Sequence, residues 1–135
     1  MKDLHNNISP AVALDTTAIG SDTTTAGNII DLQGFNSVEF VILSGTLTDG
    51  NYTPLIEDGD DSGLSDAAAV ADAELLGTEA AAAFAAASDD DAVKRIGYIG
   101  NKRYVRLSIV SASTSSGGTL SAIAVRGHAA DGPTS

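Results

Sequence analysis

Histidines and carboxylates are the residues of this chain whose types could perform acid–base chemistry. The two histidines, His5 and His128, lie near opposite ends of the 135-residue chain. A general base must reach the proton it abstracts, and solvated histidines near the termini do not make a catalytic triad. The carboxylates are numerous, but they lie in Gly-rich loops without an apolar pocket that would raise the pKa of one above another. We therefore expect no enzyme activity.

One acidic stretch has the spacing of a metal-binding loop. The run 58–63, DGDDSG, is similar to the start of an EF-hand, with acidic residues at alternate positions and a glycine at the sixth. The twelfth position is Ala69, where an EF-hand needs a bidentate glutamate. Incidental binding of a divalent cation is one interpretation, and a solvated acidic loop is the favoured one. The chain has no cysteine, so we expect no metal and no cofactor.

The most sharply patterned stretch is 92–110, AVKRIGYIGNKRYVRLSIV. Two runs rich in β-branched and aromatic residues flank Gly100-Asn101, a dipeptide that favours the two-residue turn of a β-hairpin. If Ile99 pairs with Lys102, one face of this hairpin is mostly apolar and is expected to meet the core. That face comprises Lys94, Ile96, Tyr98, Arg103, Val105, Leu107 and Ile109.

The other face of the predicted hairpin is cationic, and the same register places Arg95 opposite Arg106. Like charges that face each other on a sheet are unfavourable unless an anion lies beside them. Residues 49–91 contain twelve acids and no base, whereas residues 92–128 contain six bases and no acid. In one interpretation the bases are solvated or pair with the acidic loops of the same chain, and in the other they meet the acidic segment of a neighbouring copy or another anionic partner. The second interpretation predicts these partner-binding residues: Arg95, Lys102, Arg103, Tyr104, Arg106, Asp58, Asp60 and Asp61. Such segregated charge favours head-to-tail contact in a closed ring or trimer.

Composition indicates one small β-rich domain. The chain is 43% hydrophobic but only 4% aromatic and has no Trp, so the core must consist of Val, Ile, Leu and Ala. A net charge of −11 disfavours direct nucleic-acid binding, which needs clustered bases. No apolar run is long enough to span a membrane, and the first ten residues lack the apolar region of a secretory signal. We expect a soluble protein made in the cytoplasm.

The fold class predicted is mainly β: an antiparallel β-sandwich or jelly-roll-like barrel with at most one short helix. Residues 1–10 are expected to form a flexible arm, 11–128 the single domain and 129–135 a flexible tail. Asp49-Gly50 indicates a hairpin turn. Strands are predicted at 11–19, 28–33, 37–47, 52–57 and 120–127, loops at 21–27 and 58–65, a short helix at 69–76, and a weak strand or irregular cover at 80–87.

Two strands carry further information. In 37–47, Val38, Phe40 and Ile42 point one way, and the alternate residues Val41 and Leu43 are also apolar, so both faces are expected to be covered. In 52–57, Pro54 lacks the N–H that a ladder needs. This strand is therefore either an edge strand, or it directs the Pro54 nitrogen away from its neighbour.

Several segments, taken in order, resemble small proteins encoded beside the major capsid protein of tailed bacteriophages. The segments are 30–35 (IDLQGF), 48–50 (TDG), the acidic loop after Glu57, 75–77 (LLG), 96–106 (IGYIGNKRYVR) and 125–128 (VRGH). The match runs over most of the chain, and 96–106 is its specific part. The chain departs from the family pattern at 67–87, which is rich in alanine.

The resemblance implies a capsid decoration, or cement, protein. Such a protein lies on the outer surface of the virion, commonly as a homo-trimer, bridges major capsid subunits against the pressure of packed DNA, and catalyses nothing. Alternatives are a β-sandwich that binds carbohydrate or a host surface, and a head–tail or tail structural protein. Sugar binding needs exposed aromatic platforms, for which Tyr52, Tyr98 and Tyr104 are a poor set.

Overall fold

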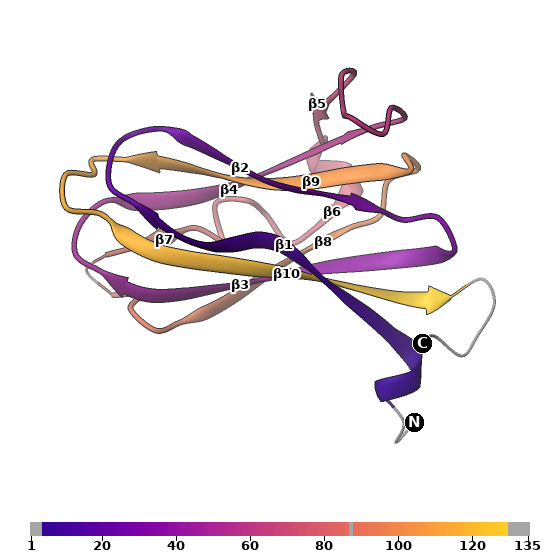
Figure 1. Ribbon diagram of the computed structural model, residues 1–135, viewed down its shortest axis with the longest axis horizontal. Coiled ribbons are helices and arrows are strands. Elements are labelled where there is room, and N and C mark those ends of the chain that lie inside the picture. The colour runs from indigo at the N-terminus through magenta and orange to yellow at the C-terminus, as the bar shows by residue number, and fades with distance from the viewer. Residues whose placement is uncertain (1–3, 87, 130–135) are drawn as a thin grey trace.

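The structure, a computed structural model that describes residues 4–86 and 88–129, consists of two antiparallel sheets stacked face to face (Figure 1). It confirms the predicted β-sandwich. Sheet A has the strand order β1 (Ile8–Ile19), β10 (Gly118–Ala129), β3 (Phe35–Leu47), β8 (Val93–Tyr98) and β6 (Leu75–Leu76). Sheet B has the order β2 (Thr24–Asp31), β9 (Tyr104–Ala112), β4 (Asn51–Gly59) and β5 (Ala68–Ala69), with β7 (Phe84–Ala85) also paired to β4. The described helices are two 3-10 turns, η1 (His5–Asn7) and η2 (Asp72–Glu74).

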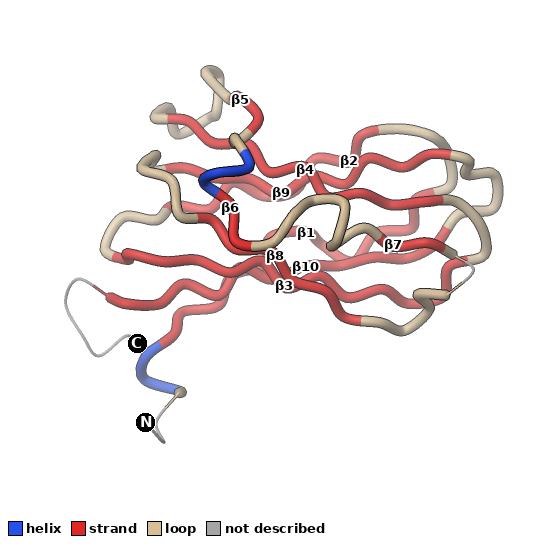
Figure 2. The backbone as a smooth tube through the Cα atoms, turned by 180° about the vertical axis from the view of Figure 1, so that it is seen from behind, coloured by secondary structure: helices blue, strands red, loops and turns tan. Residues whose placement is uncertain are grey.

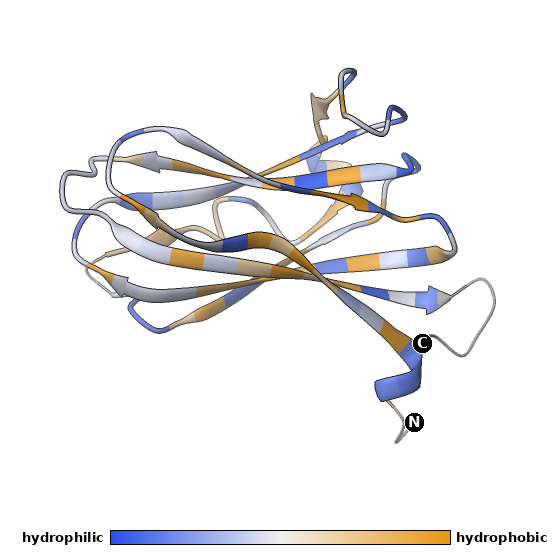
Figure 3. Ribbon diagram, in the orientation of Figure 1, coloured by the Kyte–Doolittle hydropathy of each residue, from blue (hydrophilic) through white to orange (hydrophobic). Residues whose placement is uncertain are grey.

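The core lies between the sheets and is built by alternation along the strands. Hydrophobic and polar residues alternate along β9 in Figure 3, as a sheet with one buried face requires. Phe40 and Ile42 of β3 and Leu107 and Ile109 of β9 all belong to this core, and all four are completely buried. Complete burial of each such side chain stabilises the fold by about 1.5–3 kcal/mol. The apolar residues predicted to face inward from 92–110 are confirmed as core residues, whereas Arg103 is exposed and Lys94 is only partly buried.

Both predicted hairpins are wrong, because each of the two turns joins strands of different sheets. The Asp49-Gly50 turn leads from β3 in sheet A to β4 in sheet B, and Gly100-Asn101 leads from β8 in sheet A to β9 in sheet B. Ile96 therefore pairs with Phe40, and Val105 with Ile30 and Asp58. Alternation identifies the face of a strand that meets the core, but not the strand that lies beside it.

Gly100 is needed for close packing and not for a left-handed turn. Its φ is not positive, and a Cβ built on it would lie 2.5 Å from the Tyr98 hydroxyl and 2.6 Å from Cζ of the same ring. The chain therefore passes directly over the Tyr98 ring as it crosses from one sheet to the other. A side chain at this position would have to displace that buried ring.

The alanine-rich segment covers the open edges of both sheets, and the α-helix predicted for 69–76 is wrong. Those residues form the end of β5, the η2 turn and β6. The two-residue strands β5 and β7 pair with the edge of β4, and β6 pairs with β8, so the segment lies across one side of the sandwich (Figure 2). The weak strand or irregular cover predicted for 80–87 corresponds to turns around β7, and Ala87 lies outside the described residues. Edge coverage of this kind blocks pairing with other chains.

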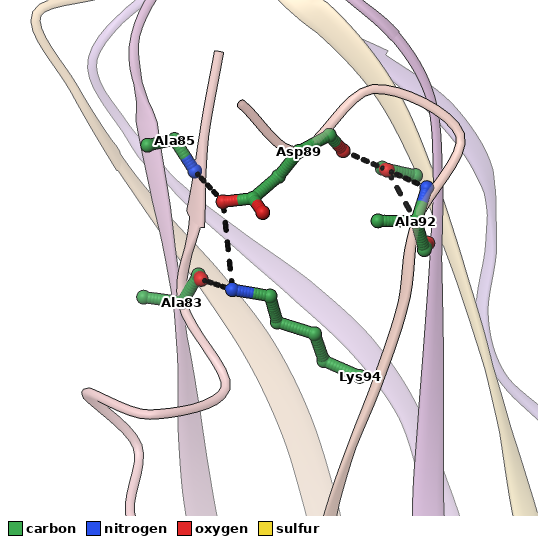
Figure 4. Close-up of polar contacts among 6 residues, drawn as sticks. Ala83, Ala85, Asp89, Ala92 and Lys94 are labelled. Atoms are coloured by element: carbon green, nitrogen blue, oxygen red, sulfur yellow. Dashed lines mark hydrogen bonds and ion pairs between the residues drawn. The ribbon is translucent and has the colours of Figure 1, made fainter. Parts of the chain in front are cut away.

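Lys94 attaches this cover to sheet A. Its Nζ donates a 2.6 Å hydrogen bond to the Ala83 carbonyl and lies 3.4 Å from Oδ2 of Asp89, which also accepts a hydrogen bond from the Ala85 N–H (Figure 4). The same ammonium lies 5.3 Å from the centre of the Phe84 ring. The small side chains of the alanine-rich segment allow its backbone to turn tightly, and Lys94 supplies polar contacts that hold this segment against sheet A.

Several boundaries differ from those predicted. β2 begins at Thr24, inside the predicted loop 21–27, and β1 begins at Ile8, inside the predicted arm. On β4, the Ile56 N–H donates to Glu79 and its carbonyl accepts from Val70, so the even-numbered residues direct their polar backbone groups away from β9. The Pro54 nitrogen therefore faces the side opposite β9, as one of the two interpretations predicted. Residues 130–135 of the predicted tail lie outside the described residues.

Candidate protein-binding surface

The structure separates the two cations that were expected to face each other. Arg95 lies on the outer face of sheet A, where it pairs with Val41, and Arg106 lies in sheet B directly opposite Glu57. Arg106 Nη2 donates a 2.9 Å hydrogen bond to Glu57 Oε1. The acid needed beside Arg106 is therefore supplied by the next strand of the same sheet.

Lys102 and Arg103 are also paired with acids of their own chain. Lys102 Nζ lies 2.9 Å from Oδ2 of Asp60. Arg103 makes a two-pronged contact with Asp31, with both N···O distances 2.9 Å, and stacks on the Tyr104 ring at 4.9 Å. These contacts raise the pKa of the Lys102 ammonium and lower the pKa of the Asp31 carboxyl, and in each case the hydrogen bond to the partner is the largest cause.

Asp58 and Asp61 have structural contacts. Asp58, predicted to begin a solvated loop, is buried in β4 and accepts a 2.7 Å hydrogen bond from the Tyr98 hydroxyl. Asp61 accepts hydrogen bonds from the backbone of Gly63 and Ser65, which lower the pKa of its carboxyl. The loop is thus held by its own carboxylates. The described residues include no group of three or more side chains that could hold a metal ion.

The outer face of sheet A is apolar, which sequence reasoning missed. Val12, Ile123, Val41 and Arg95 form one row across four strands, and Leu43 and Val93 lie side by side in the next. Val93 is 63% exposed, Val12 53%, Leu43 52% and Ile123 43%. We call the following residues the apolar face: Pro10, Val12, Val41, Leu43, Val93, Ile123 and Val125. The signal in the sequence was the apolar pair Val41 and Leu43, which we expected to be covered.

A groove of about 560 Å³ continues the apolar face at the end of the molecule that carries the described ends of the chain. Leu4 and Ile8 form one side of this end groove, and Leu76 and Ile99 the other. Gly97 permits the close approach of Glu39 and Leu76, because a Cβ there would lie 2.7 Å from Glu39 Oε1 and 3.0 Å from Leu76 Cβ. The other lining residues are Asn6, Asn7, Ser37, Val38, Tyr98, Val125, Gly127 and His128.

Two polar groups of the end groove are held in defined positions. His128 Nδ1 lies 2.7 Å from the Ser37 hydroxyl. Burial raises the pKa of the Glu39 carboxyl, and the nearby charge of Arg95 opposes that shift. A second, polar hollow of about 430 Å³ adjoins the groove and is lined in part by Asp60, Lys102 and Arg103. The structure thus gathers three of the predicted partner-binding residues at this end.

Apolar exposure is concentrated on one side of the sandwich. Of the nine large hydrophobic residues that are exposed in the described chain, seven lie on the apolar face or in the end groove, and only Ile29 and Val110 lie on sheet B. Exposed apolar surface that is concentrated in this way is typical of interaction sites and ligand-binding grooves. Tyr52 and Tyr98 are buried, so neither is available to stack on a sugar.

No protein-family model, curated protein or solved structure matches this chain. Among the described residues, no helix is both long and apolar enough to cross a membrane. The chain is therefore characterised by its own geometry: an antiparallel sandwich whose bases mostly meet its own acids, and whose sheet A presents an apolar surface to the outside.

Proposed function

We propose that this protein is a structural component of a tailed-phage virion that decorates the outer surface of the capsid and bridges major capsid subunits. The observation that carries this proposal is the end groove, which continues the apolar face at one end of the molecule. Large exposed apolar residues are costly to leave in water, and their concentration on one side favours a partner that covers them. The resemblance of 96–106 to decoration proteins supports the identity of that partner.

The end groove is the site that we propose for the capsid subunit. Its two apolar sides are separated by a floor of small residues, including Ser37 and Gly127, which leaves room for an apolar segment of the shell. A groove of this size buries only part of a standard protein interface. Many copies on one shell compensate, because subunits bridged at several points are held by all of those contacts together.

Most of the bases are already paired within the chain, which is consistent with a structural protein that does not bind nucleic acid. Five described bases, namely Lys94, Lys102, Arg103, Arg106 and Arg126, contact acids or backbone carbonyls of the same chain. A protein that neutralises phosphates needs such bases to be available to the nucleic acid. This arrangement favours a protein partner, and we propose no direct contact with the packaged DNA.

We propose that copies associate as homo-trimers on the shell, as the resemblance implies. Lys102, Arg103 and Asp60 line the polar hollow beside the end groove, where exposed ion pairs can exchange one partner for another at little cost. Tyr104 and Arg106 lie on the adjoining strand β9. Asp58 and Asp61 would act indirectly, by holding the neighbouring loop.

The experiment uses particles purified from the host that produces them. Leu76→Asp and Ile99→Asp each place a charge in the end groove, whereas Val110→Asp places one on sheet B as a matched control. The ratio of this protein to the major capsid protein is measured in each particle preparation. We expect the two groove variants to lower the ratio at least tenfold and the control to leave it unchanged. Undiminished occupancy by both groove variants would refute the proposed site.

A further inference from the structure

The apolar face contains two charged side chains, Arg95 and Glu39. The Arg95 side chain makes no hydrogen bond and no ion pair within 4 Å in the described part of the chain, and it is the only described lysine or arginine side chain of which this is true. The Glu39 side chain also has no hydrogen bond among the described residues, although it is partly buried and lies close to Gly97. Both charges are therefore available to a group from outside.

Their positions on the sheet are related in a simple way. Glu39 pairs with Gly97 and Val41 pairs with Arg95, so Arg95 and Glu39 are diagonal neighbours on the outer side of β8 and β3. Apolar residues surround them: Val41 and Ile123 continue the row of Arg95, and Val125 continues the row of Glu39. The charge of Arg95 acts on Glu39, but no ion pair within 4 Å joins the two side chains. A covering surface with an acid opposite Arg95 and a base opposite Glu39 gives each of them a direct partner.

A second copy of the same chain supplies both by symmetry. Consider a two-fold axis that lies in the plane of the contact, passes halfway between the two side chains and is perpendicular to the line that joins them. This axis places Arg95 of each copy opposite Glu39 of the other. In such an isologous contact each pairing occurs twice. The remaining surface is a sheet of Val, Leu and Ile, which packs well on another sheet face. A partner of different sequence would need the same acid and base at the same spacing.

We propose that the apolar face is a two-fold contact between copies of this protein, in which Arg95 of each copy pairs with Glu39 of the other. This contact does not depend on the capsid, although Glu39 and Val125 also line the end groove. If copies also form the proposed trimer, the two-fold contact joins one trimer to the next. The assembly in solution then contains an even number of 13.6 kDa chains in either case.

The test combines charge reversal with mixing. Arg95→Glu places two carboxylates opposite each other at both pairings, and Glu39→Arg places two cations there. Like charges across a contact cost several kcal/mol, so each variant is expected to raise the dissociation constant by roughly 100-fold or more. Mixed in equal amounts, the two variants restore an acid opposite a base at both pairings. If a variant failed to associate because its own fold was disturbed, mixing it with the other variant would not restore association.

Masses are measured by light scattering and sedimentation velocity on the full chain over a range of concentrations. We expect an even number of copies for the wild type, half that mass for each single variant, and recovery of the original mass in the mixture. Leu43→Glu should also halve the mass, and Val110→Glu on sheet B should not. Circular dichroism verifies that each variant is folded. A wild-type monomer or trimer, a mass unaffected by Arg95→Glu, or no recovery on mixing would each overturn the proposal. Arg95 and Leu43 do not line the end groove, so the masses of Arg95→Glu and Leu43→Glu test the two-fold contact separately from occupancy of the capsid.

Discussion

The Tyr98 hydroxyl in sheet A donates a 2.7 Å hydrogen bond to Oδ2 of Asp58 in sheet B, so one buried polar contact joins the two sheets. The backbone N–H of Lys102 donates to the same hydroxyl oxygen at 3.1 Å. Burial and the hydrogen bond to Asp58 raise the pKa of Tyr98, which keeps its proton on the phenol. This contact fixes the loop 99–103 that crosses between the sheets and forms part of both hollows.

Tyr98→Phe should destabilise the fold, because it leaves the buried Asp58 carboxylate without its donor. Loss of a partner from a buried polar group costs about 1–3 kcal/mol, which corresponds to a Tm lower by roughly 3–12 °C for a chain of this size. Calorimetry measures this change. Tyr104→Phe is the matched control, because the Tyr104 hydroxyl makes no hydrogen bond among the described residues. Equal Tm values for the two variants would contradict this role of Tyr98.

Gly100→Ala should lower the free energy of unfolding by about 1–3 kcal/mol, because the added methyl group collides with the Tyr98 ring. Gly20→Ala provides the comparison, since a Cβ there meets nothing within 4 Å. Removal of a glycine in that unstrained position should be neutral or slightly stabilising. Chemical unfolding of the two variants gives the difference, and a Gly100→Ala protein as stable as Gly20→Ala would show that the loop is free to move away.

Lys94→Met should loosen the alanine-rich cover without unfolding the sandwich. The variant removes the hydrogen bond to Ala83 and the ion pair with Asp89. Amide hydrogen exchange is expected to accelerate over residues 82–89, which local opening governs. Lys102→Met removes an ion pair from a different loop and should leave exchange of 82–89 unchanged. If exchange is unchanged in Lys94→Met, Lys94 does not hold the alanine-rich segment in place, and the pairing of β7 with β4 is sufficient.

The stability contributed by the Asp49 carboxylate is expected to be lost in acid. Its carboxylate accepts hydrogen bonds from Ser115, Ser116 and Gly117, with the Ser115 hydroxyl making the largest contribution, and these hold the pKa of Asp49 far below its usual value of 3.8. Because the folded-state pKa is lowered, this stabilisation is present above the unfolded-state value and is lost as the pH falls through the folded-state value.

Asp49→Asn should therefore be less stable than the wild type at pH 7, and the difference should shrink as the pH falls below about 4. Urea unfolding at neutral and acidic pH measures both proteins. A difference in stability that does not change with pH would show that it does not arise from the charge of the Asp49 carboxylate.

The sequence predicted local features well and long-range neighbours poorly. Alternation correctly predicted that Ile96 and Val105 face the core, since the side-chain period of a strand is a local property. It could not reveal that β8 and β9 lie in different sheets, because Gly100-Asn101 favours a hairpin locally while packing of the core decides the pairing. The helix predicted from the alanine content of 69–76 failed for a related reason: pairing with sheet edges outweighs a modest helix propensity.

For the candidate site, too, long-range neighbours could not be predicted from the sequence. Arg95 was predicted to lie opposite Arg106, but it lies exposed on the other sheet beside Val41. The acids that meet Lys102, Arg103 and Arg106 are supplied from strands or loops far away in the sequence. The apolar face was visible only as apolar residues on both sides of β3, a pattern that a strand covered on both faces also gives. A monomeric chain with such a strand either covers it or presents it to a partner.

The number of copies of this protein per virion tests its proposed role most directly. Quantitative mass spectrometry of purified particles gives the ratio of this protein to the major capsid protein. Decoration of the whole shell predicts on the order of hundreds of copies per particle, comparable with the many repeated capsid contacts. Roughly six to twelve copies, as in a ring at the neck or tail, or no copies at all, would contradict the account.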